Sequence, residues 1–344
     1  MMITMNDSKG KKVSLLKRPF SFLSTWRSLP PYELISYILM YASVPMLAYG
    51  IKSYNIEIAK ILILTIICLY AGYFATLIWN DITDKDIDAV AHPDRPIPGG
   101  RISARKFFAI ALIFSALTFI FAYLVSFWCF ILVGAAALFV AFHNKFLKQI
   151  IKIPAYSEIF TPIQWVVVAI FGYLAIWTAL PQNETLIISM PIFGNLISTN
   201  ITELQNMIIL VIFAYFTDVA HDVPEGIIDI EGDKKIGVRT YATSFGEKKA
   251  IKISFGMYII SGIFGILLFI RTILSPIFLI LFILLWIYMM SFSYKLIKAK
   301  DENRNEIAKT VGRKGFDYFL FCFNIIFLDL VIQLILNHYN ITFL

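Results

Sequence analysis

The stretch ILILTIICLYAGYFATLIWNDITDKDID, residues 61–88, joins a long apolar run to a group of acids. Residues 61–79 contain no charged side chain, and about twenty apolar residues are what an α-helix needs to cross a bilayer. Asp81, Asp84 and Asp88 follow directly. Acids that extend from an apolar span are costly and usually functional. The stretch therefore predicts a membrane helix that ends in a functional acidic face.

The composition indicates the same class for the whole chain. Of its 344 residues, 59% are hydrophobic and 15% are charged, and the mean hydropathy is +0.75. A soluble domain carries about a quarter charged residues. We therefore predict an all-α, polytopic membrane protein with nine transmembrane helices. The apolar runs place these helices near residues 33–52, 57–79, 107–126, 128–143, 157–180, 205–221, 250–270, 276–294 and 316–336.

The remaining segments complete the predicted organisation. Residues 1–32 form an N-terminal segment without a compact apolar core, so we expect no cleaved signal peptide. Residues 33–344 form the nine-helix membrane domain. The polar segment 181–204 is expected to be a loop whose middle lies on the membrane surface, and the charged segment 299–314 a solvated connection.

Lys and Arg side chains distinguish the two sides of the membrane. They gather before the first span and in every even-numbered connection, whereas the odd-numbered connections hold almost none. These basic residues are Lys9, Lys11, Lys12, Lys17, Arg18 and Arg27, then Arg95, Arg101, Arg105 and Lys106, then Lys145, Lys148 and Lys152, then Lys234, Lys235, Arg239, Lys248 and Lys249, and finally those from Lys295 to Lys314. The positive-inside rule places the N-terminus and these loops in the cytoplasm. Topology thus explains the net charge of +7, and because no DNA- or RNA-binding motif is present, we expect no nucleic-acid partner.

The first acidic cluster suits a divalent cation. On a continuing helix, Asp81, Asp84 and Asp88 stand at i, i+3 and i+7, which is one face. Like charges so close together repel each other unless a cation neutralises them. Mg²⁺ would do so, because it takes one or two carboxylates and fills its other positions with water and phosphate oxygens.

A second cluster, DVAHDVPEGIIDIEGDKKIGVRTYAT at residues 218–243, repeats the pattern after the sixth span. Asp229 and Asp233 stand at i and i+4, and Glu225 lies one turn earlier. Basic residues follow each cluster, namely Arg95 and Arg101 after the first and Lys234 and Arg239 after the second. Two acidic faces with adjacent cations suit a diphosphate held through Mg²⁺. The alternative is that these acids and bases merely pair with one another in water.

The three cysteines, Cys68, Cys129 and Cys322, lie far apart inside apolar runs. Because no disulfide framework or metal-ligand spacing is visible, we expect them to act as small buried apolar residues.

Both clusters resemble the signatures of a known family. Asn80-Asp81-x-x-Asp84-x-x-x-Asp88, followed by HPDRPIPGGRIS, is similar to the first signature of the UbiA superfamily of intramembrane prenyltransferases. DIEGDKKIGVRTYA, which begins at Asp229, resembles the second. The resemblance covers nearly the whole chain, since the motifs also follow the second and sixth of nine spans.

The resemblance implies nine helices around a central cavity, with an Asp-rich cytoplasmic mouth that binds a prenyl diphosphate through Mg²⁺. Asp84 and Asp229 would be catalytic. The implied metal ligands are Asn80, Asp81, Asp84, Asp88, Asp229 and Asp233, with Glu225 added from its helical position. Arg95 and Lys148 would contact the diphosphate, as the matching residues do in the family, and the adjacent Arg101, Lys234 and Arg239 are further diphosphate-binding candidates.

Two positions depart from the family pattern. Many relatives have Lys-Asp where this chain has Glu225-Gly226, so either Glu225 substitutes or this metal site has fewer acids. Relatives also often carry a Tyr upstream of the Lys148 position, where this chain has Phe142-His143. His143 could bind a phosphate or cap the carbonyls at a helix end.

The chemistry leaves the acceptor open. An allylic cation needs a dry, partly aromatic pocket, for which the candidates are Tyr73, Phe74, Trp79, Phe142, Trp165 and Tyr215. Glu33 or Glu158 could orient an acceptor or could be interfacial residues. The predicted function is prenyl transfer to an aromatic or other lipophilic acceptor in the bilayer. A membrane terpene cyclase that needs no acceptor is the alternative, and a secondary transporter is disfavoured because the acids lie at one rim and not at the midplane.

Overall fold

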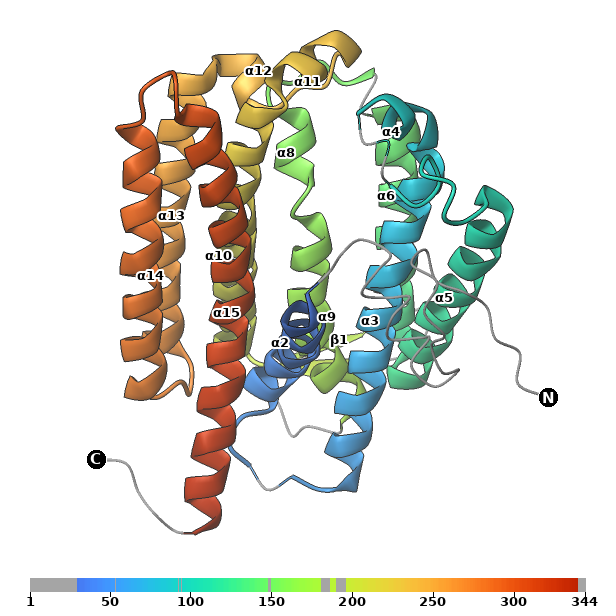
Figure 1. Ribbon diagram of the computed structural model, residues 1–344. Coiled ribbons are helices and arrows are strands. Elements are labelled where there is room, and N and C mark those ends of the chain that lie inside the picture. Colours follow the sequence, from blue (N-terminus) through green and yellow to red (C-terminus); the bar gives the residue numbers. More distant parts are fainter. Residues whose placement is uncertain are drawn as a thin grey trace, which may run out of the picture.

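The computed structural model describes residues 30–339 except 53, 92, 94, 148–149, 181–185 and 190–195. Within these residues the chain forms an elongated helical bundle (Figure 1). The helices are α2 (Pro31–Tyr49), α3 (Ile56–Thr83), α4 (Lys85–Ala91), α5 (Ala104–Val125), α6 (Phe127–Phe142), the π-helix η2 (His143–Leu147), α8 (Tyr156–Phe160), α9 (Ile163–Ala179), α10 (Ile201–Ile228), α11 (Ile230–Ile236), α12 (Tyr241–Phe245), α13 (Glu247–Arg271), α14 (Pro276–Ile297) and α15 (Arg304–His338).

The prediction of a helical, multi-pass membrane protein is confirmed, but the count of nine spans is not. In the part of the chain that the structure describes, seven helices are long and apolar enough to cross a membrane, with α8 and α9 together forming one of them. Helices occupy all nine predicted positions. The two that fall outside the count are α6, which has only 16 residues, and α2, which buries the polar side chains of Glu33, Ser36 and Ser43.

The helices form two groups joined by a central pair. In one group α10, α13, α14 and α15 pack against each other, and in the other α5 packs on both α3 and α6. The central pair, α2 and α9, contacts both groups, since α2 packs on α3 and α15 while α9 packs on α6 and α10 (Figure 1). Residues far apart in the sequence therefore meet at the centre of the bundle.

Glycines permit the closest helix contacts. A Cβ atom at Gly265 of α13 would overlap the ring of Phe282 on α14, and one at Gly262 would overlap the indole of Trp286. Small residues at such points let two membrane helices approach closely and gain van der Waals contact. The close packing of α13 on α14 therefore depends on the absence of a side chain at Gly262 and at Gly265.

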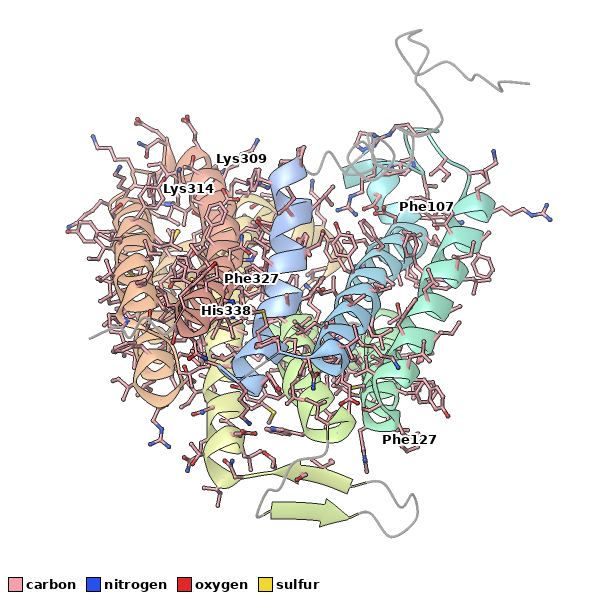
Figure 2. The ribbon with its side chains drawn as sticks, turned by 90° about the horizontal axis from the view of Figure 1, so that it is seen from below. Phe107, Phe127, Lys309, Lys314, Phe327 and His338 are labelled. Carbon is pink, nitrogen blue, oxygen red and sulfur yellow. The ribbon has the colours of Figure 1, made fainter. Side chains whose placement is uncertain are left out.

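The segment 181–204 contains regular structure that the prediction of a loop missed. Strands β1 (Leu186–Ser189) and β2 (Leu196–Thr199) pair antiparallel, and the hairpin projects beyond the helices (Figure 2). Helix α10 then starts at Ile201, because the Asn200 side chain accepts a hydrogen bond from the Glu203 N–H at 2.8 Å and caps the helix.

The segment 299–314 is an irregular connection only as far as Asn303, although most of its side chains are exposed as expected. Helix α15 begins at Arg304, and its first turns bury Ala308 and Val311. Arg304 donates to Glu247 of α13 at 2.7 Å. Hydropathy alone missed these turns because their outer face is charged. By contrast, the three cysteines are buried and free, as expected for structural residues.

The course of the chain brings all even-numbered connections to one end of the bundle. Helices α3 and α10 run in the same direction, so α4 and α11 lie at the same end, together with α12 (Figure 1). The strands β1 and β2 lie in the connection between the end of α9 and the start of α10. Both acidic motifs consequently face the same side of the protein.

Candidate active site

The first acidic motif lies where α3 passes into α4. Asp84 is the residue between the two helices, with φ −95° and ψ 7°, and its N–H donates to the Asn80 carbonyl at 2.9 Å. The Asp88 N–H donates in turn to the Asp84 carbonyl at 2.8 Å. Helical hydrogen bonding therefore continues through the junction, and Asp81 and Asp88 are only 1% and 3% exposed.

The second motif repeats this construction. Helix α10 has 28 residues, as α3 does, and α11 has 7, as α4 does. Asp229 stands between them with φ −91° and ψ 5°, its N–H donates to the Glu225 carbonyl at 3.2 Å, and the Asp233 N–H donates to the Asp229 carbonyl at 2.9 Å.

The helix starts show that the two halves correspond residue by residue. Asn55 caps α3 and Asn200 caps α10, and the spacing between these caps equals that between Asp84 and Asp229. By this spacing Asn80 corresponds to Glu225. Asp81 corresponds to Gly226, so the second motif lacks one acid that the first has.

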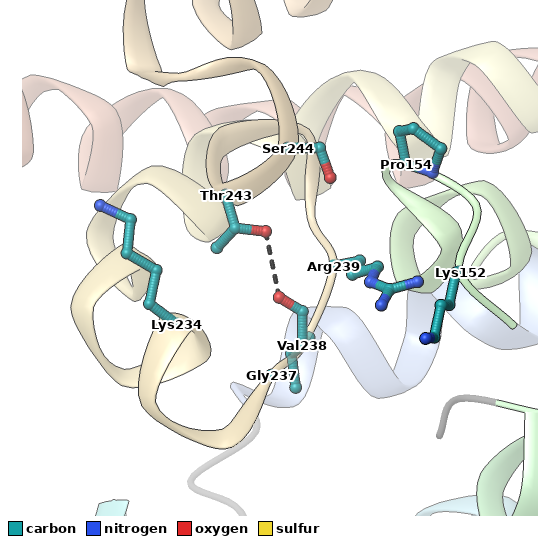
Figure 3. Close-up of a pocket in the computed structure, with 8 residues that line it drawn as sticks. All are labelled: Lys152, Pro154, Lys234, Gly237, Val238, Arg239, Thr243 and Ser244. Atoms are coloured by element: carbon teal, nitrogen blue, oxygen red, sulfur yellow. Dashed lines mark hydrogen bonds between the residues drawn. The ribbon is translucent and has the colours of Figure 1, made fainter. Parts of the chain in front are cut away.

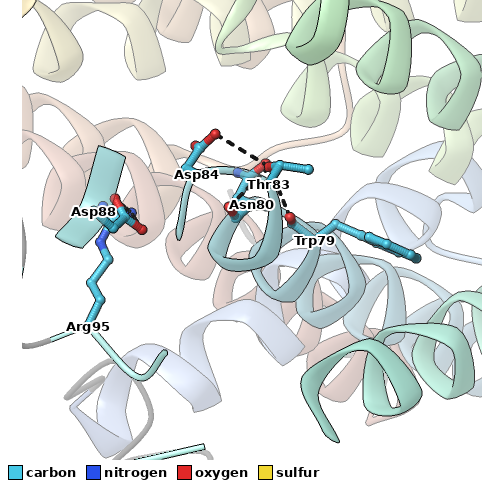
Figure 4. A network of polar contacts seen from close by, with 6 residues as sticks. All are labelled: Trp79, Asn80, Thr83, Asp84, Asp88 and Arg95. Atoms are coloured by element: carbon cyan, nitrogen blue, oxygen red, sulfur yellow. Dashed lines mark hydrogen bonds and ion pairs between the residues drawn. The ribbon is translucent and has the colours of Figure 1, made fainter. Parts of the chain in front are cut away.

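The acids of both motifs need positive charge nearby. Burial and the neighbouring Asp229 raise the pKa of Asp233 to about 6. Arg95 supplies a cation to the first motif, since its Nη1 lies 2.8 Å from both Oδ1 and Oδ2 of Asp88 (Figure 4). Arg95 was expected to contact a diphosphate. In the structure its guanidinium contacts Asp88, which is one of the expected metal ligands.

The donor set fits Mg²⁺ in its chemistry. All of these side chains offer carboxylate or amide oxygens, which are hard ligands. In the described part of the chain no three His, Cys, Asp or Glu side chains lie close enough to hold a metal ion by themselves. Mg²⁺ does not require such a cage, because it commonly takes one or two carboxylates and completes its shell with water and substrate phosphates.

Three basic residues from two segments meet at a pocket beside the second motif. Lys152, Lys234 and Arg239 line a space of about 380 Å³, together with Thr243 and Ser244 (Figure 3). Arg239 is held in place by its hydrogen bond to the Ile151 carbonyl at 3.0 Å. The structure thus brings together Lys234 and Arg239, two of the expected diphosphate ligands.

Two of the five expected diphosphate ligands, Arg101 and Lys148, remain to be placed. Arg101 is exposed just before α5. Lys148 lies outside the described residues, so the structure gives it no position.

A buried His–Asp cluster lies on α10, on the N-terminal side of the second motif. His221 Nε2 is 3.0 Å from Asp218 Oδ1, and His221 Nδ1 is 3.5 Å from Asp222 Oδ1. The sequence analysis quoted this stretch but assigned no role to Asp218, His221 or Asp222. The spacing D-x-x-H-D was the available signal, because it places all three side chains on adjacent turns of one helix.

Aromatic rings from four helices meet inside the bundle. The Tyr37 ring centroid lies 4.3 Å from that of Tyr73 and 5.9 Å from that of Trp165, and Trp165 lies 4.9 Å from Phe319. Phe74 contacts Tyr73 in the same group. Tyr37 and Phe319 were not among the aromatic candidates for the pocket, because a ring in an apolar span gives no sign of which way it faces.

The remaining aromatic candidates lie elsewhere. Trp79 donates to Ser115 at 3.0 Å, Tyr215 donates to the Ile159 carbonyl at 3.1 Å, and Phe142 is 55% exposed. His143 lies 3.4 Å from the Tyr156 hydroxyl.

The two glutamates weighed as acceptor contacts have different partners. Glu33 of α2 pairs with Arg313 of α15. Glu158 of α8 accepts a hydrogen bond from the Tyr241 N–H through Oε2. Both are buried, which distinguishes them from ordinary interfacial residues.

Known proteins are similar to this chain in sequence and in fold. The model of the UbiA prenyltransferase family matches residues 38–322. A digeranylgeranylglyceryl phosphate synthase of Methanosphaera stadtmanae is 26% identical over 274 residues, which cover 79% of this chain and 89% of that protein. In other synthases of this name the matched part spans about half of their length.

Solved structures agree in fold. A UbiA homologue from Aeropyrum pernix has a TM-score of 0.64 at 18% identity, with 88% of this chain and 99% of that one covered. A UbiA homologue from Archaeoglobus fulgidus, bound to DMAPP and Mg²⁺, has a TM-score of 0.52 at 16% identity, with 84% and 96% covered. The family match extends over most of the chain and includes both acidic motifs, and the chain therefore belongs to the UbiA prenyltransferase family.

Proposed function

We propose that this protein transfers a prenyl group from a prenyl diphosphate to an acceptor in the membrane, with Mg²⁺ as cofactor. The observation that carries the proposal is the pair of acidic motifs, built alike at the ends of α3 and α10 and facing the same end of the bundle. The Archaeoglobus fulgidus homologue bound to DMAPP and Mg²⁺ supports it.

The proposed roles follow from the donor chemistry. Asp84 and Asp229 are the catalytic acids, since each stands at the helix junction of its motif. The further metal ligands are Asn80, Asp81, Asp88, Glu225 and Asp233. When bound, Mg²⁺ would neutralise the charge that develops on the diphosphate as its bond to the prenyl carbon breaks.

The basic residues are proposed to hold the diphosphate oxygens directly. These residues are Arg95, Arg101, Lys148, Lys234 and Arg239. Lys234 and Arg239 already share one pocket, and Arg95 lies beside the first motif. Cationic donors placed before the reaction stabilise the leaving group without having to reorganise during it.

The aromatic group is proposed to receive the prenyl chain. Tyr37, Tyr73, Trp165 and Phe319 pack in the interior between the two helix groups. Such rings exclude water and stabilise an allylic cation by about 0.5–2 kcal/mol each. Their side chains would therefore favour capture by the acceptor over capture by water.

The acceptor is proposed to be a lipid, and a glyceryl phosphate ether is the first to test. The sequence relatives are named digeranylgeranylglyceryl phosphate synthases, which supports this class over an aromatic ring. The basic end of the bundle is proposed to face the cytoplasm, because the even-numbered connections carry most of the Lys and Arg.

The test is diphosphate release by the purified protein with Mg²⁺ and prenyl diphosphates of several lengths. We expect release to depend on Mg²⁺ and to require geranylgeranylglyceryl phosphate, with a phenol as the comparison acceptor. If a cyclic hydrocarbon forms without any acceptor, the protein is a cyclase and not a transferase. Failure to release diphosphate under every condition would overturn the proposed function.

A further inference from the structure

Gly226 leaves a space that another residue fills. A Cβ atom built at Gly226 would lie 2.5 Å from Oε1 of Glu158 and 3.3 Å from Cβ of Thr240. A contact of 2.5 Å is too short for any real side chain. Position 226 therefore accepts only glycine as long as Glu158 keeps its place.

The same position holds an acid in the first half of the protein. Gly226 corresponds to Asp81 by the spacing that relates α3 to α10, and Asp81 is buried at the end of α3. In the second half the carboxylate at this place comes from Glu158 on α8, which contacts the end of α10. The first motif thus takes all its acids from one stretch of chain. The carboxylates at the second motif come from two stretches, one of which contains Glu158.

Only one of the two oxygens of the Glu158 carboxylate has a hydrogen-bond partner. Its Oε2 accepts the hydrogen bond from the Tyr241 N–H, whereas Oε1 is buried and has no hydrogen-bond partner. The residue is only 5% exposed, so water does not reach this oxygen freely. A buried carboxylate oxygen without a donor is costly. A cation at Oε1 would supply the missing contact.

The backbone around Glu158 is fixed from both sides. Ala155 precedes α8 in the left-handed region, with φ 56°, which is unfavourable for a residue with a Cβ. Its N–H donates to Ser244 Oγ at 2.9 Å, and the Ser157 N–H donates to the Arg239 carbonyl at 3.1 Å. These bonds join α8 to the segment that follows α11, so Glu158 is held against the second motif.

We propose that Glu158 is a metal-binding residue of the second motif, and that it supplies through Oε1 the carboxylate missing at Gly226. The proposal rests on the proposed function, since the cation is the Mg²⁺ that accompanies the prenyl diphosphate. Mg²⁺ can accept this oxygen beside Asp229 or Asp233, because it requires only one or two carboxylates together with phosphate oxygens.

The competing explanation is that Glu158 only ties α8 to Tyr241. Glu158→Gln separates the two roles, because the amide oxygen can still accept the Tyr241 N–H while the charge is lost. A second pair of variants places a carboxylate at position 226, within the second motif itself. Gly226→Asp alone should interfere with Glu158, whereas Glu158→Ala combined with Gly226→Asp frees the space and restores an acid.

The readout is Mg²⁺-dependent thermal stabilisation of the full chain in detergent, with a prenyl thiodiphosphate that is not turned over. We expect Glu158→Gln to raise the Mg²⁺ concentration at half-maximal stabilisation by about ten- to a hundredfold, the usual range for residues that support a metal site. We expect the double variant to regain most of the affinity lost in Glu158→Ala. Glu33→Gln, which removes another buried glutamate that is paired with Arg313, should leave the midpoint unchanged.

The outcomes separate this inference from the proposed function. A wild-type midpoint in Glu158→Gln overturns the role of Glu158 alone. A double variant that binds Mg²⁺ no better than Glu158→Ala also overturns it, and if the double variant does not fold, the Glu158→Gln midpoint decides. If the wild-type protein itself shows no Mg²⁺-dependent stabilisation with the diphosphate analogue, the proposed function fails and the inference fails with it.

Discussion

Replacing Arg95 by Ala tests whether the Asp88 carboxylate pairs with Arg95 before it binds Mg²⁺. Arg95 Nη1 contacts both oxygens of Asp88 at 2.8 Å, and Asp88 is also a proposed Mg²⁺ ligand. A carboxylate that directs both oxygens to a guanidinium cannot present them fully to a metal. Without diphosphate, Arg95 and Mg²⁺ therefore compete for Asp88, and Arg95→Ala should bind Mg²⁺ more tightly than the wild-type protein.

The burial of the pair sets the size of the effect. Exposed ion pairs contribute up to about 1 kcal/mol, and removal of one partner from a buried pair costs about 3–5 kcal/mol. Here the Asp88 side chain is 4% exposed and the Arg95 side chain 31%, so the pair lies between these limits. A loss of about 1–2 kcal/mol corresponds to a roughly 5- to 30-fold gain in Mg²⁺ affinity, at about 1.4 kcal/mol per tenfold.

Turnover should change in the opposite direction. If Arg95 binds the diphosphate, its removal costs a charge-assisted hydrogen bond of about 1.5–3 kcal/mol, which is roughly a ten- to hundredfold loss in kcat/KM. Arg95→Lys should fall between the two proteins. Its ammonium could contact Asp88 as the single Nη1 does, but it lacks the planar donor fork for a diphosphate.

The assays are Mg²⁺-dependent thermal stabilisation without diphosphate and diphosphate release with all substrates. Arg105→Ala, which removes an exposed arginine at the start of α5, is the matched control and should change neither. An unchanged or weaker Mg²⁺ response in Arg95→Ala would refute the competition for Asp88. Full turnover in the same variant would show that Arg95 does not bind the diphosphate.

Four further substitutions test other parts of the site and the fold. Asp84→Ala and Asp229→Ala should each lower diphosphate release by about a hundredfold or more, since single stabilising donors contribute about 3 kcal/mol, with the melting temperature little changed; active variants would remove the proposed catalytic pair. Glu225→Gln should raise the Mg²⁺ concentration for half-maximal activity, and an unmoved midpoint would exclude Glu225 as a ligand. Gly265→Ala should lower stability by about 1–3 kcal/mol in thermal unfolding, because its methyl group overlaps Phe282, and a wild-type melting temperature would contradict the tight α13–α14 contact.

Membrane spans could be predicted from the sequence because hydropathy depends on local composition alone. The run at 57–79 became α3 and the run at 250–270 became α13, each extended by a few residues. The extension was largest where polar turns pack on other helices. The first turns of α15 are charged outside and bury Ala308 and Val311 inside, which no hydropathy window detects.

The acidic motifs could be located from the sequence because each lies within one continuous stretch of chain. Their partners could not, since those partners depend on how the helices pack. Glu158 is 68 positions before Gly226 in chain order, and only the packing of α8 on α10 brings its carboxylate to the glycine. The sequence analysis identified the missing acid at Gly226 and considered only Glu225, its neighbour, as a replacement.

The ends of α3 and α10 explain why both motifs need cations. Asp84 and Asp229 stand at these two C-termini, and Asp81 is buried one turn earlier. The fold therefore places carboxylates that repel one another close together at one end of the bundle. Only positive charge offsets this arrangement, and the short helices α4 and α11 lead directly into the basic segments that supply part of it. An anionic prenyl diphosphate would be repelled by such a surface unless a divalent cation came with it. The electrostatics thus support the diphosphate and Mg²⁺ entering together, with Arg95 neutralising Asp88 until they do.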